Sequence, residues 1–129
     1  MAAKTVLVIE DDTLQREVLA TELRQHGLTV ITSADSDDAV DRISSRPIPN
    51  LILLDMLIPT GGHDGWWFLE QRERIRELAT VPVVIMTSLS VACEEWAVSL
   101  GAAGLIRKPF DAELLPDEIQ RYLEAAFQR

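Results

Sequence analysis

A chain of 129 residues fits a single domain, and a domain of that length buries roughly two thirds of the surface that its unfolded chain exposes. Its 12 Lys and Arg against 21 Asp and Glu give a formal net charge of -9. This balance argues against direct nucleic-acid binding, because neutralised phosphates supply most of that affinity. The lone Cys93 excludes an intramolecular disulfide, and no Cys and His set has zinc-ligand spacing, so the composition suits a reducing cytoplasm.

The ends of the chain and its hydropathy limit its location. The first strand-like run begins at Thr5, which leaves no room for a signal peptide, and no apolar stretch approaches the length of a membrane span. We therefore expect one cytoplasmic domain over residues 1–129, without membrane contact and without an effector domain. The acidic surplus by itself indicates no more than a well-solvated surface.

The first half of the chain alternates strand and helix patterns. Residues 5–9 are a short apolar run typical of a buried strand, and carboxylates follow it. From Thr13 to Gly27 the apolar residues recur at helical spacing, and Gly27 is typical of a helix C-terminus: Leu14, Val18, Leu19 and Leu23. Asp12 or Thr13 caps this helix, so we interpret Asp12 as a cap rather than a site residue. A strand over residues 28–32 and a helix over residues 36–45 follow.

The second half opens on Leu-Ile-Leu-Leu-Asp, an unbroken aliphatic run over residues 51–55. Such a run is typical of a strand buried on both faces of a parallel sheet. Later patterns predict helices over residues 66–78, 90–100 and 112–127, and strands over residues 82–86 and 103–106. Pro116 removes an amide inside the last helix, which predicts a kink or a separate opening turn. Five strand and helix units without a repeat define an α/β domain with one parallel sheet.

Polar side chains stand where the predicted strands end. Glu10 and Asp11 follow the first strand, Asp55 ends the third, and Thr87 and Lys108 follow the fourth and fifth. Because the carboxyl ends of parallel strands meet at one edge of an open sheet, we expect these side chains to lie together. Three carboxylates at close range require a raised pKa or a hard cation such as magnesium. A lysine and a hydroxyl suit phosphoryl oxygens, so the set predicts a magnesium site and phosphoryl transfer to Asp55.

Four motifs in this order resemble the receiver domain of two-component response regulators over essentially the whole chain. They are Val-Leu-Val-Ile-Glu-Asp-Asp, Leu-Ile-Leu-Leu-Asp with Pro59 four residues later, Val-Pro-Val-Val-Ile-Met-Thr-Ser, and Gly-Ala-Ala-Gly-Leu-Ile-Arg-Lys-Pro-Phe. The resemblance implies a flavodoxin-like (βα)5 fold, with a five-stranded parallel sheet of order 2-1-3-4-5 and helices on both faces. It also implies that a histidine kinase or a histidine phosphotransfer protein donates a phosphoryl group, after which the chain signals through protein contacts.

Carried over to this sequence, the resemblance assigns roles to the residues at the strand ends. Asp55 becomes the phosphoacceptor, Thr87 the switch hydroxyl that moves toward the phosphoryl group, and Lys108 its counter-charge. Magnesium would be held by the carboxylates of Glu10, Asp11 and Asp55 and by the backbone carbonyl of Leu57. Movement of Thr87 would reshape the face formed by the fourth helix, the fifth strand and the fifth helix, through which the chain dimerises or binds a downstream protein.

Two spacings depart from the family pattern. Gly65 lies ten positions after Asp55, which lengthens the loop between them. His63 in this loop either reaches the site or is solvated, and the solvated interpretation is favoured. The distance from Thr87 to Gly101 is one residue short, which predicts a shorter or displaced fourth helix.

Leucines stand at three positions that matter for the switch in this family. Leu105 replaces an aromatic residue whose rotamer follows the switch hydroxyl, so gating by a large ring is not expected there. Leu57 and Leu89, two residues beyond Asp55 and Thr87, cannot orient an attacking water by hydrogen bonding. We therefore expect slow-to-moderate loss of the phosphoryl group.

Three tryptophans remain to be placed. Trp66 and Trp67 are adjacent and cannot both face the core from one helix. We expect Trp67 to be partly exposed, where it contacts a partner or forms a lid on the long loop, and Trp96 poses the same question. Exposed aromatic patches commonly mark interaction sites.

The sequence thus predicts a phosphorylation-activated receiver that uses Mg2+ and is no turnover enzyme. The alternative is a receiver fold that binds partners without phosphorylation, which the altered loop and fourth helix keep open. A phosphohydrolase of the haloacid-dehalogenase type requires a second Asp where this chain has Leu57. A nucleotide-binding Rossmann domain requires a Gly-x-Gly-x-x-Gly motif, which does not follow the first strand. No motif names the cognate kinase, the downstream target or the oligomeric state.

Overall fold

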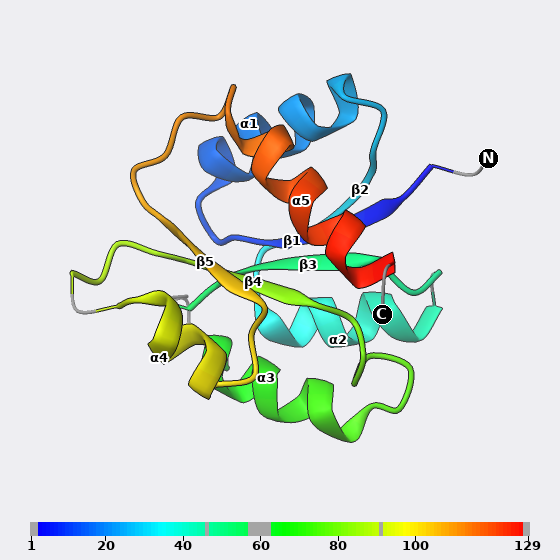
Figure 1. Ribbon diagram of the computed structural model, residues 1–129. Coiled ribbons are helices and arrows are strands. Elements are labelled where there is room, and N and C mark those ends of the chain that lie inside the picture. Colours follow the sequence, from blue (N-terminus) through cyan, green and yellow to red (C-terminus); the bar gives the residue numbers. More distant parts are fainter. Residues whose placement is uncertain (1–2, 46, 57–62, 91, 128–129) are drawn as a thin grey trace.

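The computed structural model describes residues 3–45, 47–56, 63–90 and 92–127. Within these residues five parallel strands form one sheet in the order β2-β1-β3-β4-β5: β1 Thr5–Ile9, β2 Thr29–Ser33, β3 Leu51–Asp55, β4 Val83–Thr87 and β5 Gly104–Arg107. The same residues contain five helices: α1 Thr13–Gln25, α2 Ser36–Ser45, α3 Gly65–Arg74, α4 Glu94–Ser99 and α5 Leu115–Phe127. The predicted flavodoxin-like fold and its strand order are confirmed (Figure 1).

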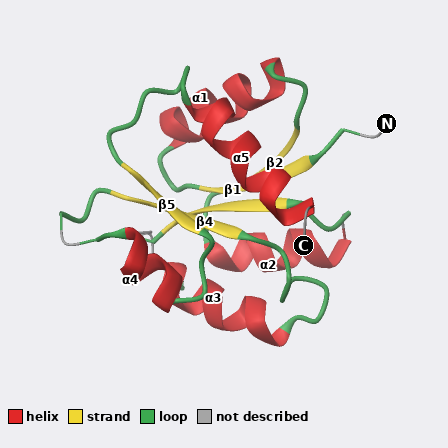
Figure 2. Ribbon diagram, in the orientation of Figure 1, coloured by secondary structure: helices red, strands yellow, loops and turns green. Residues whose placement is uncertain are grey.

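Helices cover both faces of the sheet (Figure 2). One face carries α1 and α5, and the other carries α2, α3 and α4. Because side chains alternate along a strand, Leu51 and Leu53 of β3 pack under α1 and α5, whereas Ile52 and Leu54 pack on the opposite side. Every residue of β3 is buried, as its unbroken aliphatic run predicts. None of the described helices is long and apolar enough to cross a membrane.

Strand limits agree with the predictions closely. The strands predicted over residues 5–9 and 51–55 are found there, and the other three lie one residue further along the chain than predicted. For β4 the reason is Pro82, which has no N–H to donate to a strand ladder. Its carbonyl still accepts from the Ile52 N–H at 3.0 Å, and β4 begins at the next residue.

The third helix is shorter than predicted. It ends at Arg74 rather than at residue 78, because the chain leaves helical geometry at Ile75. Leu78 is fully buried, but it reaches the core from the turn that follows the helix. Arg72 supports this turn, since its Nε donates to the Val81 carbonyl at 2.9 Å.

The fourth and fifth helices begin later than predicted. The fourth starts at Glu94 instead of residue 90, so the expected shortening is confirmed. The fifth starts at Leu115 instead of residue 112, and a separate turn precedes it. Pro116 therefore falls in the first helical turn, where its missing N–H has no intrahelical partner to lose. Of the two outcomes predicted for Pro116, the structure has the opening turn.

The third helix begins on a glycine that has no room for a side chain. Asp64 caps this helix, since its Oδ1 accepts from the Trp67 N–H at 3.0 Å. A Cβ on Gly65 would lie 2.7 Å from the Met56 Cα and 3.1 Å from the Asp55 carbonyl oxygen. The first turn of α3 therefore packs directly against the backbone that leaves β3.

Candidate functional site

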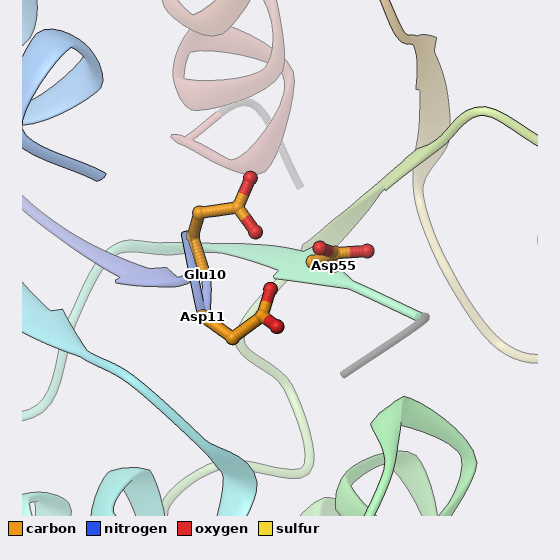
Figure 3. Close-up of side chains that lie close together, drawn as sticks. All are labelled: Glu10, Asp11 and Asp55. Carbon is orange, nitrogen blue, oxygen red and sulfur yellow. The ribbon is translucent and has the colours of Figure 1, made fainter. Parts of the chain in front are cut away.

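Two neighbouring strands bring three carboxylates to one point (Figure 3). Glu10 and Asp11 directly follow β1, and Asp55 is the last residue of β3, which pairs with β1 in parallel register. One carboxylate oxygen from each of the three lies within 4.8 Å of the others. Glu10 and Asp55 are buried, and Asp11 is half-buried. The structure thus brings together the three acids that sequence analysis selected.

A lysine lies against two of these carboxylates. Lys108 Nζ is 2.5 Å from Glu10 Oε1 and 3.1 Å from Asp55 Oδ2. The lysine follows β5, and its backbone N–H donates to the Thr87 carbonyl at 2.9 Å, which continues the pairing of β5 with β4. Its side chain crosses β4 to reach the end of β3, so the strand order places the positive charge beside Asp55.

Burial and crowding set the protonation of this cluster. Burial and the neighbouring Asp55 raise the pKa of Glu10 to about 8, and Lys108 offsets part of that rise. Burial alone would lower the pKa of Lys108, but Glu10 and Asp55 outweigh it and raise that pKa. In the metal-free protein Glu10 therefore holds a proton at neutral pH, while Lys108 stays charged.

The raised pKa of Glu10 makes the metal-free protein less stable as pH rises. Because the folded state holds this proton more tightly than the unfolded state, the free energy of unfolding falls between the ordinary pKa of 4.5 and a pH of about 8. We expect a loss of at least about 2 kcal/mol across that window, which Glu10→Gln should remove. Urea unfolding in EDTA at several pH values measures both proteins, and parallel pH profiles would contradict the prediction.

The three carboxylates fit a hard divalent cation. Magnesium prefers oxygen ligands, and Glu10 Oε2 is buried without a hydrogen-bond partner among the described residues. A cation held by Glu10, Asp11 and Asp55 would displace the proton from Glu10 and give this oxygen a partner. The predicted fourth ligand, the Leu57 carbonyl, lies outside the described residues.

Thr87 lies at the same sheet edge but is bonded to its own loop. It is the last residue of β4 and is fully buried. Its Oγ1 accepts from the Leu89 N–H at 3.1 Å, and among the described residues the hydroxyl makes no hydrogen bond to Asp55. The predicted switch hydroxyl thus lies at the same edge of the sheet as the carboxylates, but its hydrogen bond is to the loop that follows β4.

Sequence patterns missed one residue that supports the site. Arg16 Nη1 donates to the Glu10 carbonyl at 2.8 Å and to the Asp11 carbonyl at 3.4 Å. It lies one helical turn beyond Asp12, which caps α1 as predicted and accepts from the Gln15 N–H at 2.8 Å. The guanidinium therefore holds the backbone that carries two of the acids. An arginine or lysine four residues after an N-cap is common on helices, so its position in the sequence does not predict this role.

His63 is paired with α2 instead of with the carboxylates. Its Nδ1 lies 2.8 Å from Asp37 Oδ1, and its N–H donates to Asp37 Oδ2 at 3.2 Å. Hydrogen bonds from His63 lower the pKa of Asp37. The imidazole also stacks on Trp67, with centroids 3.9 Å apart. The favoured interpretation is right that His63 is exposed, but it omits the hydrogen bonds to Asp37 and the stacking on Trp67.

The tryptophans lie on α3 and α4. Trp67 is partly exposed as predicted, but Trp66 is the more exposed of the two, at 38%. The reason is that His63 covers one face of Trp67. Trp66 meets Trp96 of α4 edge to face, with centroids 6.0 Å apart.

Comparison with known proteins identifies the family and agrees with the fold. A family model for the response regulator receiver domain matches residues 6–120, and the chain belongs to that family. It is similar to the phosphate regulon transcriptional regulatory protein PhoB of Escherichia coli (strain K12), at 31% identity over 128 residues, which cover 98% of this chain and 53% of PhoB. The chain spans about half the length of the curated relatives it matches.

Solved structures repeat the fold. NtrX from Brucella abortus superposes with a TM-score of 0.87 at 28% identity, over 98% of this chain and 28% of NtrX. A CheY-like response regulator receiver domain protein from Methanospirillum hungatei JF-1 superposes with a TM-score of 0.83 at 23% identity, over 98% of each chain. At that identity the second match bears on the fold alone.

Proposed function

We propose that this chain is a phosphorylation-activated receiver that accepts a phosphoryl group on Asp55. The observation that carries the proposal is the position of Asp55 Oδ2, which lies 3.1 Å from Lys108 Nζ in a cluster of three carboxylates. An acceptor, a counter-charge and cation ligands meet at one point. Membership of the receiver family supports the same role.

Each residue of the site has a task in an in-line transfer. A carboxylate oxygen of Asp55 attacks the phosphorus, and the bond between the phosphorus and the histidine nitrogen of the donor breaks, so that the imidazole leaves with the electron pair. Lys108 pairs with one oxygen of the incoming phosphoryl group, and the Thr87 hydroxyl turns to donate to another. Glu10, Asp11 and Asp55 would hold Mg2+, which when bound neutralises charge on the transferred group. Transfer then needs no further catalytic group.

A groove beside Lys108 suits docking of the phosphoryl donor. It has a volume of about 520 Å³ and lies between α1 and the segment after β5, with a lining that includes Leu14, Val18, Lys108, Pro109 and Phe110. Leu14 and Val18 belong to the helical pattern of α1, yet they are 74% and 42% exposed. Exposed apolar stripes commonly bind proteins. We infer that a histidine kinase or a histidine phosphotransfer protein docks here.

The chemistry of the chain is limited to accepting and losing one phosphoryl group, so we do not class it as a turnover enzyme. Its output would pass through α4, β5 and α5, by dimerisation or by binding a downstream protein, and this role implies a cytoplasmic location. The alternative is an interaction module that acts without phosphorylation. The short α4 is the observation that favours it, because this helix belongs to the output face.

Acetyl phosphate separates the two functions. With Mg2+ present, intact-mass spectrometry should show one added phosphoryl group per chain, and EDTA should prevent the addition because unshielded carboxylates repel the donor. After the donor is removed, the adduct should decay over minutes rather than seconds, since a leucine at position 89 cannot orient water. A protein that keeps its unmodified mass in Mg2+ would favour the phosphorylation-independent module.

A further inference from the structure

An arginine fastens the loop between β4 and α4. Arg107 is the last residue of β5 and pairs with Thr87 of β4 in the sheet register. Its Nη1 donates to the Leu89 carbonyl at 3.1 Å, and its Nη2 donates to the Ala92 carbonyl. One guanidinium thus ties two carbonyls of the loop to the edge strand. The fourth helix begins after these residues, at Glu94.

The backbone of Leu89 is held from two sides. Its N–H donates to Thr87 Oγ1 at 3.1 Å, and its carbonyl accepts both from Arg107 and from the Ala92 N–H, at 3.2 Å. Thr87 cannot turn away without giving up the Leu89 bond or drawing Leu89 with it. Arg107 resists the second movement because it anchors the Leu89 carbonyl.

We propose that Arg107 is a positioning residue that stabilises the unphosphorylated conformation of this loop and so opposes phosphorylation of Asp55. The inference rests on the proposed function, in which Thr87 moves toward the phosphoryl group. Adjacent residues of an extended chain point to opposite sides, and Arg107 bonds to the loop whereas Lys108 bonds to the carboxylates. Of these two adjacent residues, Arg107 therefore holds the loop in the unphosphorylated form, and Lys108 supplies the positive charge that pairs with the phosphoryl group.

The effect of Arg107 on the balance between the two loop conformations should be modest. Arg107 is exposed, so water replaces part of each hydrogen bond that the guanidinium loses. A charged hydrogen bond under such competition shifts a two-state balance by about three- to tenfold. An effect of this size is easily measured and leaves the fold intact.

Arg107→Ala tests the proposal in two assays. Amide hydrogen exchange of Leu89 in the unphosphorylated protein should be about three- to tenfold faster than in the wild type, and phosphorylation by acetyl phosphate with Mg2+ should accelerate by a similar factor. Arg107→Lys replaces the guanidinium, which donates to two carbonyls, by a single ammonium group. Its exchange and phosphorylation rates should lie between those of the wild type and Arg107→Ala. Arg76→Ala removes an exposed arginine on the turn after α3 and should match the wild type.

Each outcome decides between explanations. Arg107→Ala that is phosphorylated at the wild-type rate or more slowly overturns the proposal, even if its loop exchanges faster. Unchanged exchange at Leu89 also overturns it, because Arg107 then does not hold the loop. A wild-type protein that takes up no phosphoryl group refutes the proposed function instead, and Leu89 exchange then decides whether Arg107 restrains the loop. Urea unfolding shows whether all three variants remain folded.

Discussion

Asp55→Asn is expected to take up no phosphoryl group, yet to be more stable than the wild type in the absence of metal. The amide has no nucleophilic carboxylate oxygen with which to form an acyl phosphate. The substitution also removes the Asp55 carboxylate, which raises the pKa of Glu10. The NH2 group of the asparagine can donate to the Glu10 carboxylate. We expect a gain on the order of 1 kcal/mol in the free energy of unfolding at mildly alkaline pH.

Two measurements check this pair of effects. Intact mass after incubation with acetyl phosphate and Mg2+ reports phosphorylation, and urea unfolding in EDTA reports stability. Asp41→Asn is the matched control, because Asp41 is an exposed residue of α2 and should change neither quantity. Phosphorylation of Asp55→Asn would place the acceptor on another residue. A loss of stability would mean that the contact of Asp55 with Lys108 outweighs the repulsion between the carboxylates.

Gly65→Ala is expected to lower the free energy of unfolding by about 2–4 kcal/mol and to slow phosphorylation. The added methyl carbon would lie 2.7 Å from the Met56 Cα and 2.8 Å from the Met56 Sδ. Backbone atoms cannot yield as the end of a flexible side chain does, so the chain leaving β3 must shift. That chain carries Asp55, which would move relative to Lys108.

Gly27→Ala provides the comparison, because its cost has a different origin. Gly27 has a φ of 85° and would meet nothing within 4 Å of an added Cβ, so only the left-handed backbone is penalised. We expect a cost of about 1 kcal/mol there and phosphorylation at the wild-type rate. Urea unfolding compares the two variants. If Gly65→Ala costs no more than Gly27→Ala, the start of α3 is not packed as tightly against Met56 as the structure has it.

The sheet and the carboxylate cluster follow from the sequence because burial and topology suffice to predict them. No polar residue interrupts Leu51–Asp55 before its end, which marks a strand covered on both faces. Parallel strands end at one edge, so the acids that follow β1 and end β3 must be neighbours once the two strands pair. The exposed Leu14 and Val18 show the limit of this reasoning, since helical spacing does not distinguish a buried apolar face from an exposed one.

Helix limits do not follow in the same way, because they depend on contacts between residues far apart in sequence. The fourth helix begins at Glu94, and Arg107 holds the carbonyls that precede it. The third helix ends at Arg74, and Leu78 fills the core from the turn that follows. Arg16 reaches back to carbonyls at the end of β1. The local pattern of apolar residues does not reveal that a side chain will donate a hydrogen bond to a carbonyl far away in the sequence.

The placement of the tryptophans has a practical consequence. Trp66 and Trp96 join α3 to α4 through an edge-to-face contact, whereas Trp67 lies flat against the imidazole of His63. Indole emission responds to neighbouring rings, to nearby positive charge and to water. The three tryptophans of the unlabelled protein therefore lie in two different kinds of surroundings, the contact between helices and the contact with the imidazole. Emission from Trp66 and Trp96 therefore reports the position of α4 relative to α3, and emission from Trp67 reports its contact with the His63 ring.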